Sequence, residues 1–154
     1  MKIQIIKRIV YAVLIILWMM TIFEFSNQNG DTSQGTSDVI TDKIIEINNN
    51  LENKRDQVSF CVRKLAHFSI YLIGGILAFG FFDTYSLQKK YVIAFALMFG
   101  IVYASLDEFH QSFISGRSAQ MRDVCIDTCG VITGEIISCF VKKHKKLLKE
   151  DIKN

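Results

Sequence analysis

The hydrophobic residues of this chain gather in four long blocks separated by polar segments. Each block approaches the roughly 20 apolar residues that a helix needs to cross a bilayer. The third block must continue past Leu106 to cross fully. We therefore predict an all-α, polytopic membrane protein with transmembrane helices at about residues 9–25, 65–82, 91–111 and 123–141. Half of the 154 residues are hydrophobic, which fits this class.

The long polar segment after the first block contains a second pattern. Residues 26–38 are rich in Ser, Asn, Gly, Thr and Asp, which predicts an exposed, turn-rich connection. Ser37 or Asp38 is placed to cap a helix that follows. Four apolar residues then recur at helical spacing: Ile40, Ile44, Ile47 and Leu51. We expect a short amphipathic helix here, on the outer membrane surface or over the bundle.

The distribution of basic residues predicts the orientation. Eleven of the 18 Lys and Arg residues lie near the N-terminus, between the second and third blocks, or in the tail 142–154. Basic residues favour the cytoplasmic side, so we expect both termini in the cytoplasm. The basic tail is typical of an anchor that faces anionic membrane lipids, and no nucleic-acid partner is predicted. No repeat or second domain is evident, so residues 1–154 are expected to form one domain.

The outer ends of the four predicted helices are unusually polar. They carry Glu24, Ser26 and Gln28, then Arg63, His67 and Tyr71, then Asp107, Glu108 and Gln111, and finally Asp123 and Asp127. Ionisable groups are costly in hydrocarbon and usually face a bundle interior or a wet cavity. We therefore predict a polar pocket in the outer leaflet, covered by the first loop and the turn at 116–122. The basic partners expected for its acids are Arg63, Lys64, Arg117 and Arg122.

Three motifs carry a resemblance to a known family. The segments "RKLAHFSIY", "DEFHQSFISGR" and "DVCIDTCGVITG", with "FSNQ" after the first block, resemble the VanZ-like family of bacterial integral membrane proteins. The matching residues are Arg63, Lys64, His67, Tyr71, Asp107, Glu108, Gln111, Phe113, Gly116, Arg117, Asp123, Gly130 and Gly134. Asp127 stands where the family pattern has asparagine. The resemblance implies the bacterial cytoplasmic membrane and an association with glycopeptide (teicoplanin) resistance, without an established reaction.

Three functions remain open. In the first, the pocket binds an anionic envelope lipid or a lipid-linked cell-wall precursor. Its binding residues would be Arg63, Lys64, Tyr71, Gln111, Arg117, Ser26, Gln28 and Asp127. In the second, a membrane-embedded hydrolase or transferase acts on a lipid headgroup, with catalytic candidates His67, Asp107, Glu108 and Asp123. In the third, a small proton-coupled transporter uses Asp107, Asp127 and Glu135 as relay sites.

Other residues predict packing more than chemistry. Four glycines in the second and fourth helices indicate close helix contacts: Gly74, Gly75, Gly130 and Gly134. Cys61 is placed near Cys125, but free thiols are expected. No H-E-x-x-H or C-x-x-C spacing occurs, so neither a metal site nor a cofactor is predicted.

Overall fold

The computed structural model describes residues 2–151 of the chain. Its elements are α1 (Lys2–Ser26), α2 (Gly30–Ile47), the short 3-10 helix η1 (Asn49–Lys54), α3 (Arg55–Asp83), α4 (Lys89–Gln111) and α5 (Met121–Asp151). The helices α1, α3, α4 and α5 are long and apolar enough to cross a membrane. The predicted all-α fold with four spanning helices is therefore confirmed.

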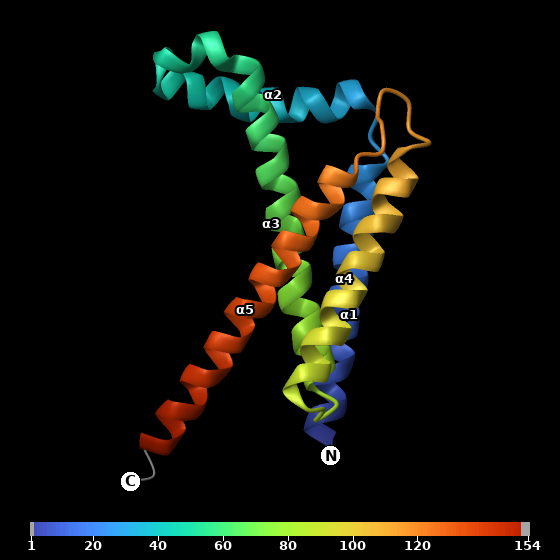
Figure 1. Cartoon of the computed structure of the whole chain (residues 1–154), viewed down its shortest axis with the longest axis vertical. Helices are drawn as coiled ribbons and strands as arrows, with labels where there is room; N and C mark the ends of the chain where they lie inside the picture. The colour runs from blue at the N-terminus through green and yellow to red at the C-terminus, as the bar shows by residue number, and fades with distance from the viewer. Residues whose placement is uncertain (1, 152–154) are drawn as a thin grey trace.

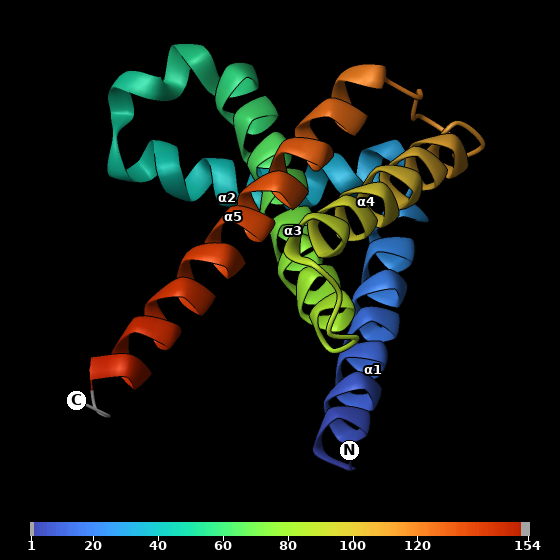
Figure 2. The ribbon, with the colours of Figure 1, turned by 60° about the horizontal axis from the view of Figure 1, so that its bottom comes forward.

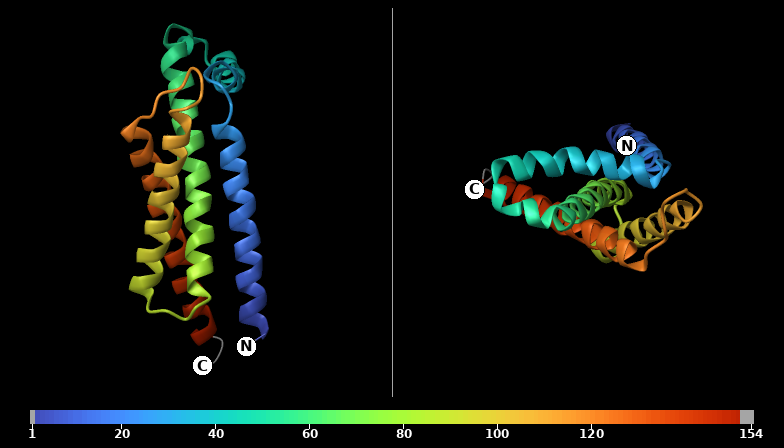
Figure 3. Two further views of the ribbon diagram at one scale, coloured as in Figure 1. Left: turned by 90° about the vertical axis from the view of Figure 1, so that its right-hand side faces the viewer. Right: turned by 90° about the horizontal axis from the view of Figure 1, so that it is seen from above.

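The four long helices run along one axis, and α2 lies across one end of them (Figure 1). Both termini lie at the opposite end, and α1 stands beside α3 and α4 (Figure 3). Towards its C-terminus α5 diverges from the other helices (Figure 2). We call the end that carries α2 the α2 end and the other the terminal end.

The closest helix contact joins α3 and α5. A Cβ atom added to Gly134 would lie 2.2 Å from the carbonyl oxygen of Leu72, and one added to Gly130 would lie 2.4 Å from that of Phe68. On the other side of the contact, a Cβ atom on Gly75 would lie 2.3 Å from the carbonyl oxygen of Val131. Glycine lets the two backbones touch here. The predicted packing role of these glycines is confirmed.

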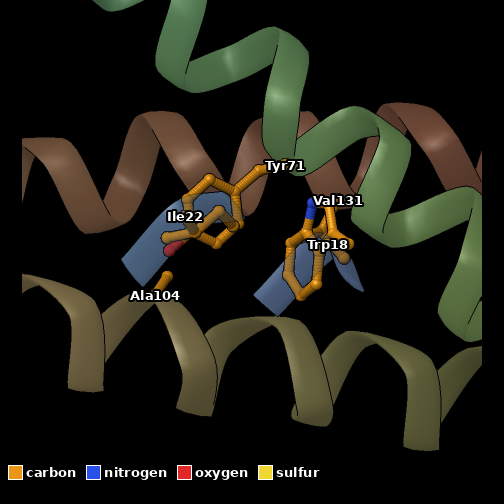
Figure 4. Packing of buried hydrophobic residues seen from close by; sticks show 5 residues of the cluster. All are labelled: Trp18, Ile22, Tyr71, Ala104 and Val131. Carbon is orange, nitrogen blue, oxygen red and sulfur yellow. The ribbon is translucent and has the colours of Figure 1, made fainter. Parts of the chain in front are cut away.

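The apolar core lies where the four long helices meet. Its buried residues are Trp18, Ile22, Tyr71, Ala104 and Val131 (Figure 4). Hydrogen bonds fasten α1 into this core: Trp18 Nε1 donates to the carbonyl oxygen of Ile70 at 2.8 Å, and the Tyr103 hydroxyl donates to that of Met19 at 2.7 Å. Many large apolar side chains of α1, such as Ile9 and Ile16, face outwards, as expected of a helix in contact with lipid.

The first loop differs from its prediction. The helix α2 begins at Gly30, so the predicted turn-rich connection is wrong from that residue onward. Its cap is Asn29, whose side chain accepts a hydrogen bond from the Thr32 backbone N at 2.8 Å. Such a cap satisfies a free N–H group at the helix start and favours an early beginning. The predicted capping role of Ser37 or Asp38 is wrong, because both residues lie inside the helix.

Two other helices extend beyond the apolar blocks that predicted them. The helix α3 has 29 residues and begins at Arg55, so it is longer than the roughly 20 residues that cross a bilayer. Its first turns therefore project beyond the apolar layer, where η1 and α2 join it. The helix α5 continues through the basic tail to Asp151.

Candidate functional site

A cavity of about 180 Å³ lies beneath α2. Its walls come from the end of α1, from α2, from the half of α3 nearer the α2 end and from the α4 end with the loop that follows it. It gathers most of the predicted site residues: Ser26, Gln28, Arg63, His67, Tyr71, Asp107, Gln111 and Arg117. Because α2 and the α4–α5 loop both contribute walls, the site is covered in the manner predicted from the sequence.

Two arginines face this cavity from different elements. Arg63 is on α3, and Arg117 comes from the loop between α4 and α5. Arg117 Nη2 donates to the carbonyl oxygen of Phe25 at 3.2 Å, and within residues 2–151 neither guanidinium is within ion-pair distance of a carboxylate. Burial lowers the pKa of Arg117, the charge of Asp107 opposes this change, and the charge of Arg63 adds to it. Arginine remains protonated in proteins, so the cavity holds two guanidinium cations beside the single carboxylate of Asp107, and this excess of positive charge is complementary to an anion.

His67 reaches the cavity from α3 with a buried acid beside it. Its Nδ1 atom lies 3.3 Å from Oδ1 of Asp127, a residue of α5 with only 1% of its surface exposed. Asp127 itself does not line the cavity. The contact uses Nδ1, so a ligand in the cavity would meet the ring through Nε2. When a carboxylate holds one ring nitrogen of a histidine in place, the other ring nitrogen has a fixed direction, as in many acid/base sites.

Asp107 forms the polar floor of the cavity. Gln111 Nε2 donates to Asp107 Oδ2 at 3.0 Å, one helical turn away. The hydroxyls of Ser26 and Tyr71 lie near this carboxylate, but neither makes a well-aligned hydrogen bond within the described part of the chain. Buried hydroxyls nearly always have a partner in proteins. Both hydroxyls lie on the cavity wall beside the Asp107 carboxylate and add to the polar character of this floor.

The structure places other predicted site residues outside the cavity. Lys64 Nζ lies 2.5 and 2.6 Å from the two carboxylate oxygens of Asp123, an ion pair that joins α3 to α5. Glu108 Oε1 accepts a hydrogen bond from the Gln120 backbone N at 2.5 Å and so holds the α4–α5 loop to α4. Arg122 donates to the side chain of Gln120 at 2.9 Å. These groups already have partners within the chain, whereas Arg63 has no ion pair within residues 2–151.

The sequence did not predict the α2 side of the site. Ser33, Thr36, Ser37 and Ile40 line the cavity from α2. A signal was present, because Ser33, Ser37 and Thr41 recur every four residues and so share one face of a helix. The composition of residues 26–38 is typical of turns, so the sequence did not predict a helix from this spacing.

The four spanning helices and the polar cavity between them define a multi-pass membrane protein. In the described residues, no group of three or more His, Cys, Asp or Glu side chains is placed to hold a metal ion. The chain belongs to the VanZ/LLP1 family, whose family model matches residues 11–142. This match agrees with the resemblance carried by the three motifs. Searches of curated proteins and of solved structures find no match.

Proposed function

We propose that the protein binds an anionic lipid of the bacterial cell envelope, or a lipid-linked cell-wall precursor, in the cavity beneath α2. The observation that carries this proposal is the pair Arg63 and Arg117, which face one cavity without an acidic partner in the described residues. A guanidinium group binds phosphate or carboxylate through two parallel hydrogen bonds. Two such groups from separate elements can hold one phosphate from two sides.

The rest of the wall supports an amphiphilic ligand. Apolar side chains alternate with the polar ones around the cavity: Ile22, Phe25, Ile40, Val62 and Ile70. Pockets for drug-sized ligands measure roughly 300–1,000 Å³. A cavity of about 180 Å³ instead suits a phosphate and its immediate linkage, with the lipid chains outside in the bilayer.

The proposal includes an orientation and a setting. We place the lysine-rich terminal end in the cytoplasm and the α2 end at the outer face of the bacterial cytoplasmic membrane, with residues 1–154 as one domain. The cavity then opens in the leaflet where cell-wall precursors are used. Binding there would connect the protein to glycopeptide resistance, including resistance to teicoplanin.

Lipid binding by matched variants tests the proposal. Protein in nanodiscs would be titrated with phosphatidylglycerol, which is anionic, and with phosphatidylcholine, which carries no net charge. The double variant Arg63→Gln/Arg117→Gln should bind phosphatidylglycerol at least about tenfold more weakly, because it removes both charges that face the ligand. Arg122→Gln is the matched control, since Arg122 lies in the first turn of α5, outside the cavity, and bonds to Gln120.

Two results would contradict lipid binding at this site: equal affinity of the wild type for both lipids, or unchanged affinity of the double variant. Teicoplanin susceptibility of a bacterial host that expresses the same variants then tests the link to resistance. We expect the double variant, and not Arg122→Gln, to lose any protection given by the wild type.

A second function is favoured by the contact between His67 and Asp127. This pair would allow His67 to act as a general acid or base on the headgroup held by the arginines, as in a hydrolase or transferase. His67→Gln should then keep lipid affinity but abolish release of the headgroup, measured by mass spectrometry of lipids incubated with the protein. If the wild type releases no headgroup from phosphatidylglycerol or a lipid-linked precursor, the catalytic function is rejected and the binding function stands.

A further inference from the structure

A second cavity lies between α4 and α5, at the terminal end of the bundle. It measures about 450 Å³, and its walls are mainly apolar: Ile93, Leu97, Ile132, Ile136 and Phe140. It lies on the half of α5 that diverges from the other helices (Figures 1 and 2). We call it the α4–α5 groove. It shares no lining residue with the cavity beneath α2.

One acidic side chain, that of Glu135, lines this apolar groove. Glu135 is 4% exposed, and its Oε1 atom has no hydrogen-bond partner in the described part of the chain. An unpaired carboxylate among apolar side chains at membrane depth is costly, and either a proton or a positive charge beside it removes this cost. Within the described residues Glu135 therefore lacks a positively charged partner, and a cationic ligand in the groove can supply one.

The other titratable groups of the groove do not supply this charge. They are Lys89, Lys143 and Cys139. Lys89 is exposed at the start of α4 and Lys143 is exposed on α5, so their ammonium groups reach water. Lys143 lies eight residues beyond Glu135 on α5, which is about 12 Å along the helix at 1.5 Å per residue. Charges interact far more strongly in the apolar interior than at the wetted rim, so Glu135 dominates the deep part of the groove.

We propose that the α4–α5 groove binds a lipophilic organic cation, with Glu135 as its counter-ion. The volume lies within the range of pockets for drug-sized molecules, roughly 300–1,000 Å³. Its apolar walls suit the hydrocarbon part of such a ligand, and the carboxylate suits its charge. A metal ion is a poorer fit, because a stable site needs several oxygen, nitrogen or sulfur ligands and this groove offers one carboxylate and one thiol.

Two ions of nearly equal size and opposite charge provide the test. Purified full-length protein would be titrated with tetraphenylphosphonium and, separately, with tetraphenylborate. The wild type should bind the phosphonium ion at least about tenfold more tightly, and Glu135→Gln should lose this preference, because it removes the one buried acid that lines the groove among residues 2–151. Glu135→Asp should keep the preference in weakened form. The control is Glu24→Gln, which removes an exposed acid of α1.

A second variant tests the location without altering the acid. Ile136→Trp adds bulk to the groove wall and should weaken binding of the phosphonium ion while Glu135 remains. Folding of each variant is checked by thermal unfolding in the same detergent. Equal or tighter binding of tetraphenylborate, or unchanged selectivity in Glu135→Gln, would overturn the proposal and indicate a site for lipid chains or for a lipid phosphate at the lysines. The variant Arg63→Gln/Arg117→Gln should bind the phosphonium ion normally, so this proposal and the proposed function can fail independently.

Discussion

Each end of the bundle has an ion pair between a lysine and an aspartate, and the two pairs differ in their exposure to solvent. At the α2 end, Lys64 pairs with Asp123, and their side chains are 13% and 10% exposed. At the terminal end, Lys142 pairs with Asp83, and their side chains are 60% and 32% exposed. Protein atoms surround most of the Lys64–Asp123 pair, whereas water solvates the Lys142–Asp83 pair. Loss of one partner should therefore cost more at the α2 end, where the remaining charge would stay mostly buried.

An apolar layer separates the polar groups of the two ends. On α5, Val131 lies midway between Asp127 and Glu135 and is fully buried. It packs against Gly100 of α4, where an added Cβ atom would lie 2.6 Å from a Val131 methyl carbon. The predicted relay from Asp127 to Glu135 would have to cross this layer. The two cavities are better explained as separate sites than as the two mouths of one path.

The largest expected effect is the loss of the buried ion pair. Lys64→Ala leaves Asp123 without its partner in a mostly buried position, which should lower the free energy of unfolding by about 3–5 kcal/mol. Lys142→Ala removes the same kind of partner from an exposed pair and should cost no more than about 1 kcal/mol. Equilibrium unfolding in detergent would compare the two variants.

The double variant Lys64→Met/Asp123→Leu sharpens this comparison. It removes both charges of the buried pair and should be more stable than Lys64→Ala, since no unpaired charge remains. Equal losses of stability for Lys64→Ala and Lys142→Ala would show that burial at the α2 end does not set the strength of the pair.

The sequence predicted the fold well because each spanning block is strongly apolar. The four spanning helices can be predicted without knowledge of tertiary contacts, because length and hydropathy alone define a span. The start of α2 was missed for a local reason. The cap by Asn29 makes a helix out of a segment whose composition is typical of turns.

The sequence named most of the residues that line the cavity, but not which way each of them faces, and of the four basic partners expected for the acids only Lys64 pairs with one in the described residues. Glu108 and Asp107 are neighbours in sequence, yet one bonds to the Gln120 backbone and the other lines the cavity. Consecutive residues point about 100° apart on a helix, so the rotation of α4 about its axis decides their roles. That rotation depends on contacts such as Gly100 against Val131, which no single motif specifies.

A smaller effect is expected where α2 is fastened over the cavity. The Gly30 backbone N donates to the carbonyl oxygen of Ser115 at 3.1 Å, and a Cβ atom added to Gly30 would lie 2.3 Å from the carbonyl oxygen of Gly116. Gly30→Ala should therefore displace the start of α2 and cost about 1–3 kcal/mol of stability. Phosphatidylglycerol binding should weaken with it, measured in nanodiscs.

The matched control is Gly35→Ala in the same helix, where an added Cβ atom meets nothing within 4 Å. This variant should be neutral or slightly stabilising, because alanine favours a helix over glycine. If Gly30→Ala lowers stability but leaves lipid affinity unchanged, the position of α2 does not control access to the cavity.

The smallest expected effect compares two tyrosines of α4. Tyr103 donates its hydroxyl to the carbonyl oxygen of Met19 at 2.7 Å and fastens α4 to α1, whereas Tyr91 lies exposed at the terminal end of the same helix. Tyr103→Phe removes only this hydroxyl, so it should lower the free energy of unfolding by about 0.5–1.5 kcal/mol. Tyr91→Phe should change it by less than about 0.5 kcal/mol, as is usual for surface substitutions. Unfolding in one detergent would measure both, and equal values would mean that the hydrogen bond from Tyr103 to α1 adds no net stability.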